Sequence, residues 1–477
     1  MLFVLTAYLS SSCEKEDISP INQEVAFVKY YGHVGAQTAT DVIKTSDGGY
    51  ILLGSTNSYS TRQEMDILVV KTDSLGNEVW SSSFGRSAEG PSGSYLRFSE
   101  EGIRIIELPD QSAYVIAANR TYYTYSSASS PANSGVKGKT KVVLYQLDYG
   151  TGAPTIAAGT ELKDATAFTE VVSDMKIDTA GGAYNYILTG YTTDIQPNKP
   201  NDDDNGALDK TDIFTALLND QFAIQWTTSA LAYGFPRADY GTSVQILGGG
   251  YLICGTSEEK SIGAGQATIL LPRIITVIMS KSGGIPLNVS YFTADGYYFE
   301  GGRSVYDADN GVITIAAHVR VTDRTITGEG GKIALLQITE ALVPITPNAS
   351  AEPYCKLYDL QDRNGSGGGE HFVASIALLE GNNGFILSST QRQSDFESDL
   401  CITKFDRDLE IESGWPYFFG YSDVNRLILT KDEAGTILPV TTTSGSISGY
   451  VFTGKFGLGT NEMMGMVKLN TNGTLIP

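Results

Sequence analysis

One acidic loop of this chain has the residue types and the spacing of a calcium-binding loop. Oxygen-bearing side chains fall at positions 1, 3, 5, 9 and 12 of a twelve-residue segment, namely Asn201, Asp203, Asn205, Asp209 and Asp212. Gly206 stands at position 6, where such loops turn sharply, and Ala207 would offer its backbone carbonyl at position 7. Position 1 is Asn instead of Asp, and position 12 is Asp instead of Glu. A solvated acidic hairpin loop is therefore the alternative to a calcium site.

A cysteine near the N-terminus indicates a lipid anchor. Residues 2–9 form an apolar stretch that is too short to span a bilayer and is typical of a signal-peptide core. Ser10-Ser11-Ser12-Cys13 follows, and the arrangement resembles a bacterial lipoprotein signal, in which the cysteine is lipidated and becomes the first residue. No Lys or Arg precedes the stretch, and Ser10 stands where an aliphatic residue is usual, so an ordinary secretory cleavage site is the alternative. We expect residues 1–12 to be a signal peptide and residues 13–24 a lipidated tether.

The residues directly after Cys13 could act as an address. They are Glu14, Lys15, Glu16 and Asp17. This run resembles the acidic, Lys-containing export signal that sends lipoproteins of Bacteroidetes to the outer face of the outer membrane. The resemblance implies a chain anchored in the outer membrane and facing the cell exterior; a merely solvated linker is the alternative.

Tyrosines form a further set of residues able to bind a ligand. An exposed Tyr can stack on a sugar ring or anchor a protein partner. The alternative is that many of these side chains pack inside the fold. The predicted binding residues, with one histidine among them, are Tyr122, Tyr123, Tyr125, Tyr233, Tyr297, Tyr298, His371 and Tyr417.

Histidine and cysteine are too sparse for a metal centre built on them. Besides Cys13 the chain has Cys254, Cys355 and Cys401, without any C-x-x-C spacing, and reduced thiols within strands are expected. It has three histidines. The Gly-rich segment 365–369 matches a nucleophile motif only loosely and lacks the strand-to-helix context that a nucleophile elbow needs. No catalytic residue is assigned.

The elements that carry these residues belong to a repeat. Its clearest copy reads Gly48-Gly49-Tyr50-Ile51-Leu52-Leu53-Gly54-Ser55, then Asp66-Ile67-Leu68-Val69-Val70-Lys71-Thr72-Asp73, then Gly76-Asn77-Glu78-Val79-Trp80. The repeat occurs seven times at spacings of 62 to 72 residues. Each copy is marked by the residue that opens its second strand: Tyr50, Tyr114, Tyr186, Tyr251, Ile313, Phe385 and Tyr450. Apolar runs bounded by turn residues predict strands. Repeated four-stranded meanders predict an all-β, seven-bladed β-propeller with antiparallel blades over residues 25–477.

The two ends of the chain predict how the ring closes. The seventh copy stops after its third strand and turn, and the pattern of a fourth strand stands instead at the N-terminus. There Phe27 lies five residues before Gly32, the spacing that Trp80 and Gly85 have in the first copy. Residues 25–31 are therefore expected to complete the last blade and to cover a sheet edge that would otherwise be open.

Binding in such a ring is expected on one face. The connections from each outer strand to the next inner strand share a face with the loops between second and third strands. Here these connections are the long ones, and long loops on a rigid scaffold are where binding usually resides. The acidic loop and the tyrosines lie in or beside them, for example in segments 122–139, 194–212, 232–240, 293–302, 362–371 and 417–423.

The repeat resembles the propeller repeats common in secreted and surface proteins of Bacteroidetes. The resemblance extends over nearly the whole chain, although only the first copy shows the consensus in full. It implies a fold and a habitat and carries no shared catalytic residues. The net charge of −21 disfavours binding to nucleic acid or to anionic lipid surfaces.

Together these features favour a non-enzymatic, surface-exposed lipoprotein whose propeller binds a partner, as an accessory subunit of an outer-membrane complex. The expected partner is an outer-membrane barrel protein, another surface protein or a glycan. The membrane is touched only through the lipid, and calcium is the only cofactor that the sequence suggests. The alternatives are an enzyme acting on polysaccharide, with carboxylates on the long-loop face, and a glycan-binding lipoprotein without catalysis.

Overall fold

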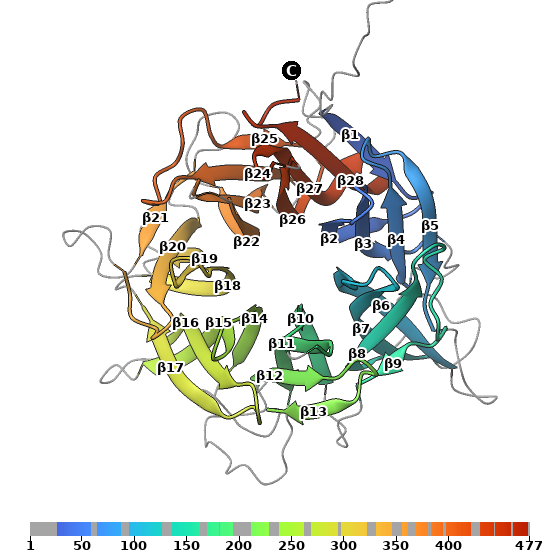
Figure 1. Cartoon of the computed structure of the whole chain (residues 1–477), viewed down its shortest axis with the longest axis horizontal. Helices are drawn as coiled ribbons and strands as arrows, with labels where there is room; N and C mark the ends of the chain where they lie inside the picture. The colour runs from blue at the N-terminus through green and yellow to red at the C-terminus, as the bar shows by residue number, and fades with distance from the viewer. Residues whose placement is uncertain are drawn as a thin grey trace, which may run out of the picture.

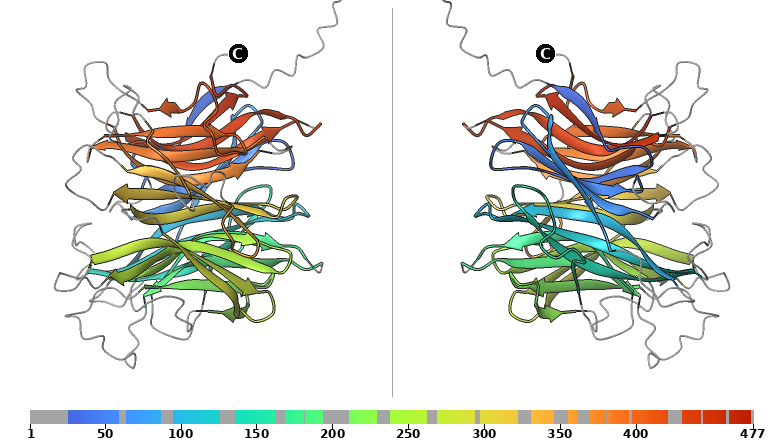
Figure 2. Two further views of the ribbon diagram at one scale, coloured as in Figure 1. Left: turned by 90° about the vertical axis from the view of Figure 1, so that its left-hand side faces the viewer. Right: turned by 90° about the vertical axis from the view of Figure 1, so that its right-hand side faces the viewer.

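Seven four-stranded antiparallel sheets form a closed ring in the computed structural model, as the repeat predicts (Figure 1). Side views show the strands of each blade running between the two faces of the ring (Figure 2). The structure describes residues 26–58, 64–86, 95–125, 136–162, 169–180, 182–193, 211–228, 238–261, 269–293, 297–321, 331–345, 355–360, 369–379, 381, 383–394, 397–420, 430–442, 444–458 and 461–475. Every regular element within these ranges is a strand.

The first four blades each run from an innermost to an outermost strand in chain order. Blade 1 contains β2 (Gln37–Lys44), β3 (Tyr50–Thr56), β4 (Asp66–Thr72) and β5 (Glu78–Phe84). Blade 2 contains β6 (Tyr95–Glu107), β7 (Ala113–Tyr125), β8 (Val136–Asp148) and β9 (Thr160–Glu161). Blade 3 contains β10 (Thr169–Asp178), β11 (Asn185–Thr193), β12 (Thr211–Leu218) and β13 (Ile224–Thr227). Blade 4 contains β14 (Asp239–Ile246), β15 (Gly250–Ser261), β16 (Ile269–Ser280) and β17 (Pro286–Phe292).

The last three blades complete the ring. Blade 5 contains β18 (Tyr297–Asp307), β19 (Val312–Val321), β20 (Lys332–Thr339) and β21 (Lys356–Tyr358). Blade 6 contains β22 (Glu370–Leu378), β23 (Phe385–Ser394), β24 (Glu397–Phe405) and β25 (Tyr417–Phe419). Blade 7 contains β26 (Glu433–Thr441), β27 (Ile447–Leu458), β28 (Asn461–Asn470) and, as its outer strand, β1 (Phe27–Tyr31).

The N-terminal strand closes the ring. β1 pairs antiparallel with β28, from Phe27 opposite Lys468 to Tyr31 opposite Met464. Figure 1 shows the two strands side by side, one blue and the other red, although they come from opposite ends of the chain. This confirms the predicted closure, with β1 starting two residues later than expected.

The middle strands of each blade form the core because neighbouring blades cover both of their faces. β3 and β12 are buried along their entire length. The seven residues that mark the repeat each stand in the second strand of a blade, and none is more than 3% exposed. The near-continuous apolar runs in the sequence are thus strands sandwiched between blades.

The turns between third and fourth strands also follow the repeat. Each has a residue with a positive φ shortly after the third strand: Gly76, Gly152, Phe222, Gly284, Leu342, Leu409 and Gly473. Several turns are also fixed by a polar side chain, as where Asp73 accepts the backbone N–H of Leu75 at 2.9 Å and that of Asn77 at 2.8 Å. Trp80 of blade 1 lies directly against Gly152 of blade 2, so the outer strand of one blade packs on the turn of the next.

Candidate ligand-binding channel

Every inner strand carries an irregularity at the same place. Near the middle of each, the register against the second strand shifts: between Ala39 and Asp41, Gly102 and Arg104, Val172 and Asp174, Gly241 and Ser243, Glu300 and Gly302, Val373 and Ser375, and Ala434 and Ile437. Such bulges leave one residue unpaired and re-aim the side chains beside it. Because all seven inner strands have a bulge at the same level, the bulges are a regular feature of the channel wall.

The bulges bring one polar residue from each blade into a ring. In six blades this polar residue pairs with the residue three positions after the repeat marker. In blade 1, for example, Asp41 pairs with Leu53, three residues after Tyr50. In blade 7 the polar residue lies within the bulge itself. We call the set the polar ring; its members are Asp41, Arg104, Asp174, Ser243, Arg303, Ser375 and Thr436. All seven line one cavity of about 340 Å³.

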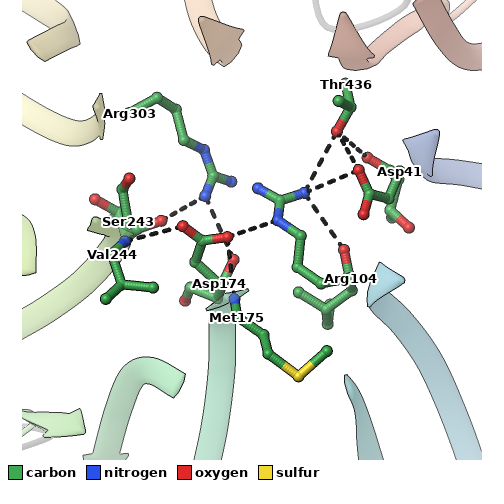
Figure 3. A network of polar contacts seen from close by, with 12 residues as sticks. Asp41, Arg104, Asp174, Met175, Ser243, Val244, Arg303 and Thr436 are labelled. Atoms are coloured by element: carbon green, nitrogen blue, oxygen red, sulfur yellow. Dashed lines mark hydrogen bonds and ion pairs between the residues drawn. The ribbon is translucent and has the colours of Figure 1, made fainter. Parts of the chain in front are cut away.

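The acidic members of the polar ring lie on either side of Arg104 (Figure 3). The Arg104 Nε donates to Asp174 Oδ1 at 2.7 Å, and its NH1 lies 3.7 Å from Asp41 Oδ1. The Thr436 hydroxyl donates to Asp41 Oδ1 at 2.7 Å. The same carboxylates accept backbone N–H groups of the following blades, from Ile105 at 3.0 Å and from Val244 at 2.9 Å. The polar ring therefore joins neighbouring blades as well as lining the channel.

Burial and the neighbouring charges shift the pKa values of the charged residues in the polar ring. Burial raises the pKa of Asp41 despite the nearby Arg104. Burial opposes ionisation of Asp174 too, but Arg104 and then Lys176 hold the pKa of this carboxyl below its usual range. The pKa of Arg104 is raised, because the two carboxylates outweigh the effect of burial. Arg104 is thus the main counter-charge of both buried aspartates in the channel.

Arg303 is placed differently from Arg104. Its NH1 donates to two backbone carbonyls, that of Thr242 at 2.5 Å and that of Ser173 at 3.4 Å (Figure 3). Within the part of the chain that the structure describes, no carboxylate forms an ion pair with Arg303. Burial, and then the like charge of Arg104, lower its pKa to about 10. Its environment therefore disfavours the positive charge that it carries at neutral pH.

A second, larger cavity lies on the other side of the polar ring. It measures about 850 Å³ and is lined by the first halves of several inner strands and by the ends of β23 and β27. Arg104 and Arg303 line both cavities. Because inner strands begin and second strands end on the face that carries the long connections, this larger cavity belongs to what we call the loop-bearing face. The smaller cavity lies toward the opposite, turn-bearing face.

The tyrosines predicted to form a binding face do not share one environment. Tyr122 is half-buried, donates its hydroxyl to Glu161 and packs edge-on against Phe98 with 5.1 Å between ring centroids. Tyr125 is only 2% exposed. Tyr123, Tyr297 and Tyr298 are partly exposed near the loop-bearing ends of β7 and β18. Tyr233 lies outside the described residues.

Two members of the predicted set lie elsewhere than expected. His371 is fully buried in β22, with its Nε2 3.3 Å from the Leu360 carbonyl oxygen, and burial lowers its pKa to about 4. It is therefore a neutral structural group of blade 6 and not an exposed one. Tyr417 belongs to the outer strand β25 and contacts Gly473 in a turn of blade 7. That contact places Tyr417 toward the turn-bearing face, because the turns between third and fourth strands lie there.

The remaining predicted sites fall mostly outside the described residues. Cys13, Lys15, Glu16 and Asp17 do, as do Asn201, Asp203, Asn205, Ala207 and Asp209 of the acidic loop. Asp212 is described: it lies in β12, is 6% exposed and adds its charge to the surroundings of the buried Asp239. In the described part of the chain no group of three or more His, Cys, Asp or Glu side chains is arranged to hold a metal ion.

The three cysteines within the ring are free thiols, as expected. Cys254 and Cys401 are buried, whereas Cys355 is only partly so. Burial raises the pKa of the Cys254 and Cys401 thiols to about 12, so neither is a nucleophile at neutral pH. None of the described elements is a helix long and apolar enough to cross a membrane.

No protein-family model and no curated protein matches this chain. Solved structures similar to it include Drosophila Plexin A in complex with Semaphorin 1b, with 8% identity, a TM-score of 0.37, and 92% of this chain and 88% of the other covered. An apocarotenoid oxygenase from Synechocystis matches with 10% identity, a TM-score of 0.40, and coverage of 93% and 92%. The NanB sialidase from Streptococcus pneumoniae matches with 11% identity, a TM-score of 0.40, and coverage of 95% and 72%. Likeness at this level bears on no particular chemistry.

Proposed function

We propose that this chain is a lipid-anchored binding propeller of the outer membrane, which engages a surface protein through its loop-bearing face as an accessory subunit of an outer-membrane complex. The observation that carries the proposal is where the N-terminal strand joins the ring. The lipid on Cys13, its export signal and the partner are all part of the proposal.

The start of β1 lies at the turn-bearing face. Phe27 contacts Gly76 in the turn between β4 and β5. Lys29 Nζ lies 3.3 Å from Asn77 Oδ1, and the Tyr31 hydroxyl donates to the Gly76 carbonyl at 2.8 Å. The chain therefore enters β1 at the turn-bearing face, on the outside of blade 7.

This geometry would orient a lipid-anchored ring. The tether of residues 13–24, together with the two residues before β1, reaches at most roughly 50 Å when extended. It is attached opposite the larger cavity and the long connections, so the loop-bearing face is the one free to meet a partner. The closed ring supplies the rigid scaffold, and the connections on that face supply the variable contact surface.

Membrane attachment is tested by substituting the cysteine. Cys13→Ala should move the protein from the membrane fraction to the soluble fraction, whereas the control Cys355→Ala should leave it attached. Replacing Lys15, Glu16 and Asp17 with Ala should keep the lipid and remove protease access in intact cells. A Cys13→Ala protein that stays in the membrane fraction would contradict the anchor.

Partner binding is tested on the native complex. Gentle solubilisation and mass spectrometry should recover a stoichiometric outer-membrane protein. With Cys355 replaced by Ser, single cysteines introduced at Thr124 and Asn472, two exposed positions on opposite faces, should then react differently with a maleimide. The partner should protect Thr124→Cys and leave Asn472→Cys reactive. A protein that purifies alone and retains or cleaves a polysaccharide would replace this proposal by its glycan alternatives.

A further inference from the structure

We propose that the larger cavity of the channel is a binding site for a small organic carboxylate, held by the guanidinium of Arg303. This inference concerns the channel alone and depends neither on the lipid anchor nor on a protein partner. It is based on the charge of the wall, on the contacts of Arg303 and on the size of the cavity.

The wall of this cavity is positive in a protein that is strongly negative. Its acidic residues are Glu101 and Glu433, and the net charge of the chain is −21. Five cationic side chains line it: Arg104, Arg303, Arg392, Lys431 and Lys455. A concave site of one sign surrounded by the opposite sign focuses the field onto a ligand of matching charge. The ligand that this wall favours is therefore an anion.

Most of these cations already have carboxylate partners. Lys455 Nζ contacts Glu433 Oε1 at 2.7 Å and Glu462 Oε1 at 3.3 Å, and Arg392 pairs with Glu370. Arg104 is engaged with both aspartates of the polar ring, as described above. Their charges are largely compensated by these carboxylates, so the charge that a ligand would meet in the cavity is mainly that of Arg303.

Arg303 is the cation that has hydrogen-bond donors left for an anionic ligand. Its only hydrogen bonds in the described structure go from NH1 to the Thr242 and Ser173 carbonyls, so Nε and NH2 keep donors in a fixed planar arrangement. A planar oxyanion accepts two such N–H groups at once, which is the strongest pairing available to arginine. The lowered pKa of Arg303 fits this view, because an anion would remove the cost of its charge.

The size and the lining of the cavity favour an organic anion. A volume of about 850 Å³ is in the range of sites that hold small molecules. Apolar side chains such as Ile103, Val171 and Val373 alternate with hydroxyls such as Thr40 and Ser173. A carboxylate on a small carbon skeleton would match both kinds of surface, whereas an inorganic ion would match only the charge.

The test measures binding of defined acids to the purified full chain at low salt. Isothermal titration with galacturonate and with glutarate should show binding by at least one of them, and galactose, which has the same ring as galacturonate without its carboxylate, should bind at least about tenfold more weakly. Arg303→Met should weaken acid binding by at least about tenfold, as expected for a charge-assisted pair of hydrogen bonds. Arg407→Met, at a partly exposed arginine that pairs with Asp307, should bind like the wild type.

Folding of the variant is checked separately, so that a loss of binding can be interpreted. Because Arg303 adds like charge beside Arg104, Arg303→Met should keep a melting temperature close to that of the wild type. A second variant, Arg392→Gln, removes charge at the rim and should weaken binding by less than Arg303→Met. No binding of either acid at millimolar concentration, or equal binding by the folded Arg303→Met protein, would overturn the proposal. Binding of inorganic phosphate that is as tight as that of the acids would overturn the organic class.

Discussion

At the scale of single residues, the polar ring assigns different roles to two arginines of the same channel. Arg104 neutralises Asp41 and Asp174, which are both buried, whereas Arg303 donates hydrogen bonds to backbone carbonyl groups. A buried charge that loses its partner is far more costly than the pair was worth. Removal of the charge should therefore destabilise the fold strongly at Arg104 and only slightly at Arg303.

Arg104→Met tests this difference. It should lower the free energy of unfolding by about 3 to 5 kcal/mol at neutral pH, because two buried carboxylates lose their counter-charge. Denaturant unfolding followed by tryptophan fluorescence measures the effect, and Thr436→Val, which removes one hydrogen bond to Asp41, should cost only about 1 kcal/mol. If Arg104→Met were as stable as the wild type, the ring would not be held by this charge.

Asp239 gives the molecule a predictable response to pH. Burial, and to a lesser extent the nearby Asp212, raise its pKa to about 7 from 3.8, although Ser257 and Arg273 act in the opposite direction. The folded state thus holds this proton more tightly than the unfolded chain does. The stability that it contributes is complete below about pH 4 and is lost as the pH rises toward 7.

The substitution Asp239→Asn should abolish this dependence. The variant should be more stable than the wild type by an amount on the order of a few kcal/mol at pH 8, and the difference should vanish near pH 4. Denaturation midpoints measured across this pH range give the comparison. Asp220→Asn, at an exposed carboxylate, serves as the control and should run parallel to the wild type. A constant difference between Asp239→Asn and the wild type at all pH values would exclude titration as the cause.

At the scale of elements, blades are joined by outer-strand aromatics that pack on the turns of the next blade. Trp80 fills the space above Gly152, whose φ is +68°, and Trp226 stands in the same relation to Gly284, whose φ is +61°. A side chain at either glycine would meet both the strain of a positive φ and the ring of the tryptophan.

Gly152→Ala separates these two effects when it is compared with Gly182→Ala. Gly182 has a φ of +80° but nothing within 4 Å of an added Cβ, so its substitution should cost only the backbone strain, about 1 kcal/mol. Gly152→Ala should lower the melting temperature further, because Trp80 must move as well. Thermal unfolding of both variants measures the difference, and equal losses would mean that the contact between the blades contributes little.

At the scale of the whole molecule, stability depends on closing the ring with β1. All five residues of β1 pair with β28, so its removal would expose an edge and uncover part of the core around Met464. Deletion through Tyr31 should therefore cause aggregation or a large loss of melting temperature. Deletion through Pro20 should have no effect, and a shared melting temperature for the two truncations would refute the role of β1 as the closing strand.

The sequence by itself determined the architecture, because each blade repeats the same local signals. Apolar strand runs, turn residues and the spacing between Phe27 and Gly32 were sufficient to predict seven antiparallel blades and their closure by the N-terminal strand. Each of these signals lies within a short segment of the sequence, so differences in loop length between the copies do not remove it. The sequence suggested tyrosines as binding residues, but it did not show which of them the fold buries or on which face each lies.

Only the tertiary structure decided which residues meet in the channel. The members of the polar ring stand at variable distances before the repeat markers, 9 residues for Asp41 and Tyr50 but 14 for Thr436 and Tyr450, so no fixed spacing reveals them. Bulges and unequal turns absorb these differences and bring the seven residues to one level. For the same reason His371 was assigned to an exposed face when the fold buries it against Leu360. Strand pairing is local, whereas a ring of seven side chains exists only once all seven blades have closed.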